Sequence, residues 1–164
     1  MGEAYNYTCK KCHYHYPVFI GIGLSYYECY RNKLAEISEG SYGIEWKNLL
    51  DQTPFAAIDA SSVVYICSSC NRWEIGTNIT LYAPDNPERI ADSFNWIKAV
   101  ECGEYIPYVP KWDLKKNYHV LKRYYHKCKE CGSRMHLASK TEVRYLPCPQ
   151  CGESNETDGL LMWD

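Results

Sequence analysis

Eight of the ten cysteines form four pairs with the same spacing, in which two residues separate the two members. That spacing lets one tight turn direct both sulfur atoms at a single point. A metal ion held tetrahedrally by thiolates needs four of them, so two pairs complete one closed site and four pairs complete two sites. The pairs are Cys9 and Cys12, Cys67 and Cys70, Cys128 and Cys131, and Cys148 and Cys151.

This donor set predicts two Zn²⁺ ions, with iron as the alternative because a tetrahedral four-sulfur site suits either metal. Residues 1–7 have neither a basic start nor an apolar run, so they do not predict a signal peptide. No apolar stretch approaches the roughly 20 residues that span a bilayer. We therefore expect a cytoplasmic protein without a membrane partner, whose thiols stay reduced and bind metal instead of forming disulfides.

The last two pairs carry the clearest pattern. Sixteen residues lie between Cys131 and Cys148, and the two knuckles read Cys-Lys-Glu-Cys-Gly and Cys-Pro-Gln-Cys-Gly. Glycine after the second cysteine permits the positive φ that closes such a turn. Residues 124–153 thus resemble the zinc-ribbon and rubredoxin-like families, and the resemblance implies a small β module built on a metal site, with no activity attached. The whole chain resembles small bacterial double-zinc-ribbon proteins of unknown function.

The first two pairs are separated by 54 residues, from Cys12 to Cys67. Elements close in sequence usually pack together, so we expect sequential pairing: first knuckle with second, third with fourth. Four pairs can be joined into two sites in three ways, and among the alternatives interleaved pairing would fuse both halves of the chain into one unit. His13 and Asn71 stand where the later knuckles have glycine, and His is less suited to a positive φ. We therefore expect the first ribbon to be the less regular one.

These expectations define an α+β protein with two zinc-ribbon (rubredoxin-like) β modules, the first elaborated by two or three helices. The predicted domains are residues 1–104 and 112–164, divided at the proline-containing segment 104–111. The sequence pattern predicts helices over 25–38 and 44–51 and a third starting at Asn86-Pro87. It also predicts a hairpin over 72–82 and strands over 63–66, 118–126, 135–138 and 142–146.

We expect no enzymatic activity. Catalytic zinc keeps an open coordination position, and four thiolates leave none. His13 and His15 adjoin a knuckle and are the only candidates to replace a cysteine ligand. The spare thiols, Cys29 and Cys102, lack the cationic or helix N-terminal surroundings that activate a nucleophile.

Residues 111–129 combine seven Lys or Arg side chains with one acid and several aromatic rings. Basic groups attract phosphates and aromatic rings stack on unpaired bases, so this segment is a candidate for binding RNA or single-stranded nucleic acid. The alternative is that these cations offset the −2 formal charge of each zinc–thiolate centre. The candidate residues are Lys115, Lys116, Lys122, Arg123, Tyr124 and Tyr125.

A protein partner is the interpretation that we favour. The chain has 16 Tyr and 5 Trp, residue types that anchor protein interfaces, and its pI of about 6.2 argues against broad affinity for nucleic acid. The segment 160–164 is an apolar tail that we expect to form a strand of the second ribbon. The sequence thus predicts a double-zinc protein-interaction module, with nucleic-acid binding second and a rubredoxin-like iron electron carrier third.

Overall fold

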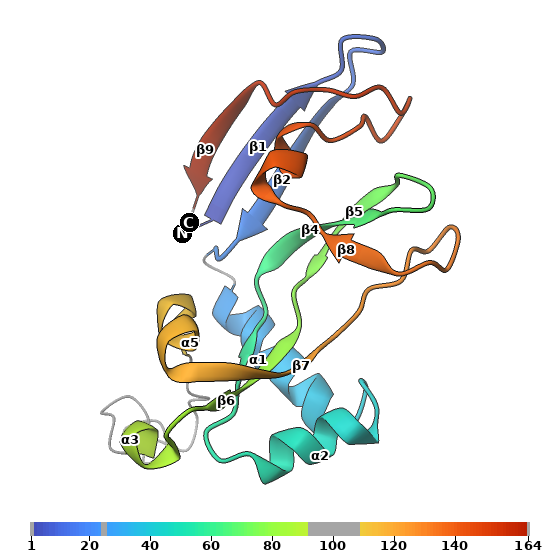
Figure 1. Cartoon of the computed structure of the whole chain (residues 1–164). Helices are drawn as coiled ribbons and strands as arrows, with labels where there is room; N and C mark the ends of the chain where they lie inside the picture. Colours follow the sequence, from blue (N-terminus) through green and yellow to red (C-terminus); the bar gives the residue numbers. More distant parts are fainter. Residues whose placement is uncertain (1, 24–25, 92–108, 164) are drawn as a thin grey trace. The chain divides into compact units, whose positions relative to one another are not determined.

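The computed structural model describes residues 2–23, 26–91 and 109–163, which contain five helices and nine strands in antiparallel sheets (Figure 1). The predicted α+β class is confirmed. The chain forms two compact units, and neither is a continuous stretch of sequence. Unit 1 comprises Met1–Leu24, Ser61–Asn78 and Tyr125–Asp164, and unit 2 comprises Ser25–Ala60 and Ile79–Tyr124.

Unit 1 is built on a six-stranded sheet of order β5-β4-β2-β1-β9, with β8 paired to β4. Each neighbouring pair of strands is antiparallel. The strands are β1 (Gly2–Thr8), β2 (His15–Gly21), β4 (Ser62–Cys67), β5 (Trp73–Thr77), β8 (Met135–Leu137) and β9 (Gly159–Trp163).

Alternating side chains build the main core of unit 1. Tyr5 and Tyr7 of β1 are buried, as are Tyr16 and Val18 of β2, and the Tyr7 and Tyr16 rings stack with centroids 4.8 Å apart. Tyrosine rings supply large apolar area, and their hydroxyls find partners in the chain that covers them. Tyr7 donates a hydrogen bond to the carbonyl of Val143, and Tyr16 donates one to that of Leu146 at 3.1 Å. The tyrosine-rich core thus fixes residues 143–146 onto the first hairpin.

Unit 2 contains four of the described helices and a three-stranded sheet of order β3-β6-β7. A small apolar core that includes Ala57, Ile90 and Leu114 joins two of these helices to the sheet. None of the helices in the described residues is long and apolar enough to cross a membrane. The elements are α1 (Tyr26–Ser38), α2 (Ile44–Gln52), α3 (Pro87–Ala91), α5 (Lys111–Asn117), β3 (Ala57–Asp59), β6 (Thr80–Pro84) and β7 (Tyr118–Arg123).

Two predicted elements are wrong. The strand expected over 142–146 is instead the helix α6 (Lys140–Arg144), because Ser139 and Glu142 form a capping box in which each side chain accepts the other's backbone N–H. The hairpin expected over 72–82 does not form, since β5 pairs with β4 in unit 1 and β6 pairs with β3 and β7 in unit 2.

The domain division also differs from the expected one at residues 104–112. The chain passes between the units four times, so each predicted domain contributes to both units. The physical reason is strand pairing: β9 joins β1 and β8 joins β4, which draws the C-terminal residues into the sheet of the N-terminal ones. Most of the predicted boundary, 104–108, lies outside the described residues.

The capping box yields a stability prediction. Ser139→Ala should lower the free energy of unfolding of unit 1 by about 1 kcal/mol, because the α6 N-terminus loses the oxygen that accepts the Glu142 N–H. Urea titration of the metal-loaded protein measures this loss. Ser154→Ala, an exposed serine of the same unit, is the matched control and should change stability by less than about 0.5 kcal/mol. Equal effects of the two substitutions would contradict the assigned role of Ser139.

Candidate metal centres

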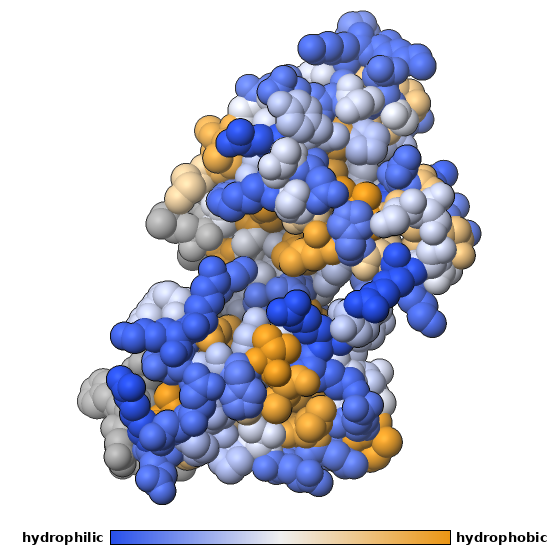
Figure 2. Space-filling model, viewed as in Figure 1, coloured by the Kyte–Doolittle hydropathy of each residue, from blue (hydrophilic) through white to orange (hydrophobic). Residues whose placement is uncertain are grey.

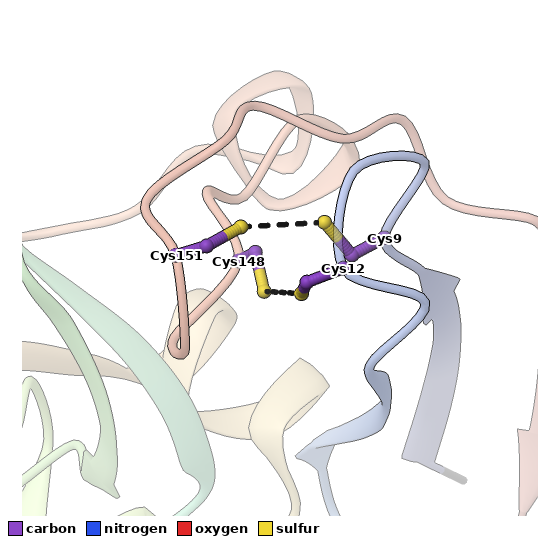
Figure 3. Close-up of side chains that lie close together, drawn as sticks. All are labelled: Cys9, Cys12, Cys148 and Cys151. Carbon is purple, nitrogen blue, oxygen red and sulfur yellow. Dashed lines mark hydrogen bonds between the residues drawn. The ribbon is translucent and has the colours of Figure 1, made fainter.

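Cys9, Cys12, Cys148 and Cys151 bring their sulfur atoms together at the first centre, all within 4.8 Å of one another. The turn between β1 and β2 supplies the first two, and the loop after α6 supplies the others. Figure 3 shows the two loops facing each other with the four sulfurs between them. The Cys9 and Cys151 sulfurs lie 3.5 Å apart, and those of Cys12 and Cys148 lie 3.6 Å apart.

Cys67, Cys70, Cys128 and Cys131 form a second centre with the same arrangement. The turn between β4 and β5 supplies one pair, and the turn before β8 supplies the other. Between the two turns, the Cys67 and Cys131 sulfurs lie 3.5 Å apart, those of Cys70 and Cys128 3.6 Å apart, and those of Cys70 and Cys131 3.8 Å apart. Both centres belong to unit 1.

These separations fit a tetrahedral metal ion. A Zn–S bond of about 2.3 Å places neighbouring sulfurs of a tetrahedron about 3.8 Å apart. A disulfide bond would instead bring two sulfurs to about 2.05 Å. The four-cysteine groups therefore match the donor type, number and spacing that zinc or iron takes in a closed site.

All four knuckles have the same backbone hydrogen bonds. The residue after the second cysteine donates its N–H to the carbonyl of the first cysteine at 2.8–2.9 Å. The first cysteine donates its own N–H to the residue five positions later, at 2.7–2.9 Å. This geometry requires a positive φ after the second cysteine, and the four residues there are His13 (58°), Asn71 (57°), Gly132 (72°) and Gly152 (75°).

The irregularity expected of the first two knuckles, at His13 and Asn71, is therefore wrong. His13 adopts the left-handed conformation at a cost of roughly 1–2 kcal/mol, because the turn that directs Cys9 and Cys12 at one point requires it. His13 and His15 belong to neither four-cysteine group, and the His15 ring lies 3.4 Å from the Thr8 hydroxyl.

The expected sequential pairing is wrong as well. The first knuckle joins the fourth, across 136–142 residues of sequence, and the second joins the third, across 58–64 residues. The pairing is nested, which neither sequential nor interleaved pairing describes. It follows from the strands: β9 pairs with β1 and returns the fourth knuckle to the first hairpin, while β8 pairs with β4 beside the second knuckle.

Polar contacts hold the fourth knuckle in place. The side chain of Asn155, only 3% exposed, accepts the Lys10 N–H at 3.2 Å. Trp73 donates its indole N–H to the Pro147 carbonyl at 2.7 Å. Thr157 N–H donates to the Arg144 carbonyl, and Asp158 N–H to the Asn6 carbonyl. These bonds help to position Cys148 and Cys151 opposite the first hairpin.

Without a cation, the sulfurs of each centre compete for protons. The backbone N–H groups of Cys12 and Lys11 lower the pKa of Cys9 to about 6, and the hydroxyl and N–H of Ser133 lower that of Cys131 to about 6. The Tyr14 N–H lowers the pKa of Cys12. Burial and hydrogen bonds to neighbouring sulfurs outweigh this effect and raise that pKa to about 12. A divalent cation would favour the thiolate form of all four cysteines.

A groove of about 430 Å³ lies between the second and fourth knuckles. Cysteines of both centres line it, among them Cys70 and Cys151, and its walls include Arg72, Trp73 and Gln150. Both centres thus border one solvent-accessible hollow.

Ser68, His136 and Glu142 form a hydrogen-bonded series near the second centre. The Ser68 hydroxyl lies 3.2 Å from His136 Nδ1, and His136 Nε2 lies 2.9 Å from a Glu142 oxygen. The Ser139 N–H, with His136, lowers the pKa of Glu142 to about 2. This carboxylate therefore stabilises the fold above pH 4.5, an effect lost as the pH falls toward 2. The series links the start of α6 to the second knuckle.

The candidate nucleic-acid residues belong to both units and lie in different surroundings. Lys115 and Lys116 lie exposed in the last turn of α5, and Arg123 is exposed at the end of β7. Lys122 forms an ion pair with Glu45. Tyr124 packs edge-on against Tyr42, and Arg134 lies over the Tyr125 ring. The unit boundary falls between Tyr124 and Tyr125.

Of the two spare thiols, Cys29 lies in α1 with its sulfur 3.7 Å from the Ala60 carbonyl. Cys102 lies outside the described residues.

Comparisons with protein-family models, curated proteins and solved structures found no match for this chain.

The nested pairing makes a prediction that metal content can test. Cys9→Ser with Cys148→Ser should lower bound metal from two ions per chain to one, because both ligands belong to the same centre. Cys9→Ser with Cys67→Ser should remove both ions. Elemental analysis of the purified variants measures the number of metal ions per chain. Cys29→Ser is the control, and it should retain two metal ions. Sequential pairing would reverse the results of the two double variants.

Proposed function

We propose that this chain is a non-enzymatic protein whose two four-cysteine centres each hold one structural Zn²⁺, and that it acts as a protein-interaction module. The observation that carries the metal proposal is the convergence of four sulfurs within 4.8 Å of one another in both groups, with pairs as close as 3.5 Å in each. Four thiolates complete the tetrahedral coordination of zinc, which gives the ion a structural role.

Each ion would join two turns that are far apart in sequence. The first centre connects the β1–β2 hairpin to the chain before β9, and the second connects the β4–β5 hairpin to the chain before β8. Binding free energy of structural zinc is folding free energy, because the ligands converge only in the folded chain. The metal would therefore stabilise unit 1, whose surface is then free to bind a partner.

Nucleic-acid binding through residues 111–129 is the weaker candidate. Its strongest support is the exposure of Lys115, Lys116 and Arg123, together with Trp112, which is 69% exposed. Against it, the Tyr124 and Tyr125 rings already contact Tyr42 and Arg134, and Lys122 is engaged by Glu45. Base stacking needs open ring faces, so these contacts weaken the nucleic-acid candidate.

Removing the metal tests the structural role. A strong chelator should release two zinc ions per chain, and amide hydrogen exchange of unit 1 should then rise most in the four knuckles and in β8 and β9. The physical reason is that these short elements depend on the ions that join their turns. Elemental analysis gives the number of zinc ions released, and mass spectrometry gives the rate of amide hydrogen exchange. Visible absorbance with bound iron would instead support an electron carrier, and unchanged exchange after metal loss would contradict a structural role.

The nucleic-acid candidate has its own test. Labelled single-stranded RNA should show no salt-dependent fluorescence anisotropy change with the metal-loaded protein at low ionic strength. If it binds, Lys115→Glu with Lys116→Glu should abolish the signal, while Lys47→Glu, a cation of α2 outside segment 111–129, should leave it intact. That pair of results would overturn the preference for a protein partner.

A further inference from the structure

Strand β9 forms one end of the six-stranded sheet. It pairs with β1, and among the described strands no other pairs with it, so its second edge presents backbone N–H and C=O groups. Its side chains are also exposed: Leu160 is 49% exposed, and Leu161 and Met162 are each 61% exposed. Figure 2 shows hydrophobic atoms gathered on this side of unit 1.

The register places these side chains on both faces of the sheet. Leu161 lies in line with Ala4 and with Phe19, which is 44% exposed. Leu160 lies on the opposite face, in line with Tyr5 and Val18 of the core, because successive residues of a strand alternate. An added strand would therefore cover apolar side chains on both faces and satisfy the free backbone groups at once.

The usual protection of an edge strand is missing in Gly159–Met162. Natural sheets block such edges with lysine, proline, a bulge or a covering element. The sequence Gly-Leu-Leu-Met has no proline and no charge, and its pairing with β1 runs without a break. This combination is the one that strand-addition interfaces use, where main-chain hydrogen bonds give affinity and alternate side chains give specificity.

The charges around β9 indicate the chemistry of the occupant. Residues 145–164 contain four acidic side chains and no basic one, and Asp158 and Glu156 lie exposed just before the strand. Like charges placed opposite each other destabilise a strand pair and opposite charges stabilise it, so an occupant with a basic end beside Asp158 fits this edge best.

We propose that β9 is a docking edge for an extended segment of a partner protein, apolar in its centre and flanked by lysine or arginine. The inference rests on the proposed function as an interaction module and names its surface and the kind of segment that it takes. The partner strand extends the sheet of unit 1, covers Leu160, Leu161 and Met162, and places its basic end beside Asp158.

Two synthetic peptides test the proposal on the full, metal-loaded chain. Both have five alternating valine and threonine residues in the centre, and two lysines or two glutamates flank each end. The lysine-flanked peptide should bind at least about 10-fold more tightly by isothermal titration calorimetry. Methylation of its alternate backbone nitrogens should abolish binding, because the methyl groups block strand pairing.

Leu161→Lys should weaken binding of the lysine-flanked peptide at least about 10-fold, because it places a cation on the edge. Ile44→Lys, a substitution of a similarly exposed apolar residue in α2, is the matched control and should leave binding unchanged. Equal binding of the two peptides, or equal effects of the two substitutions, would overturn the proposal. Absence of binding, with dimers in sedimentation that Leu161→Lys abolishes, would assign the edge to a second copy and also overturn it.

Metal content, measured on the same samples, separates this inference from the proposed function. Two zinc ions per chain with no peptide binding would reject the docking edge and leave the structural metal proposal intact. Absence of metal would reject the metal proposal, whatever the peptides do.

Discussion

The convergence of four sulfur atoms at each of two points is the constraint on which the rest of unit 1 depends. Each convergence requires two turns with the same backbone geometry, including a residue with positive φ after the second cysteine. It also requires strands that bring those turns together from distant parts of the chain. The pairs β1–β9 and β4–β8 meet this requirement, and they determine which knuckles face each other.

The nested arrangement has a modest entropic cost. Closing long loops in place of short ones adds only about 2 kcal/mol for the two centres together, because closure cost grows with the logarithm of loop length. Structural zinc contributes roughly 10–16 kcal/mol to the folding of small zinc domains, which far exceeds that cost. Buried tyrosines also stabilise the loop that joins the first and fourth knuckles, because the hydroxyls of Tyr7 and Tyr16 donate hydrogen bonds to the carbonyls of Val143 and Leu146.

A closed four-thiolate centre offers a ligand no coordination position, so any interaction must use the protein surface. The basic segment 111–129 and the β9 edge differ in how many of their groups are free to contact a partner. In the basic segment 111–129, the side chains of Lys122, Tyr124 and Tyr125 already contact other residues of the chain. The β9 edge keeps free backbone groups and exposed apolar side chains, both of which a partner strand would satisfy.

The sequence alone determined the local features: the four knuckles, the glycines at two of the positive φ positions, and helices α1 and α2, which lie within one residue of their expected bounds. These depend on spacing and on neighbouring residues. Tertiary structure decided which knuckles pair, how the chain divides into units, and that β5 and β6 join different sheets. Strand partners are chosen by long-range burial and hydrogen bonding, so cysteine spacing, which is identical in all four pairs, could not distinguish one pairing from another.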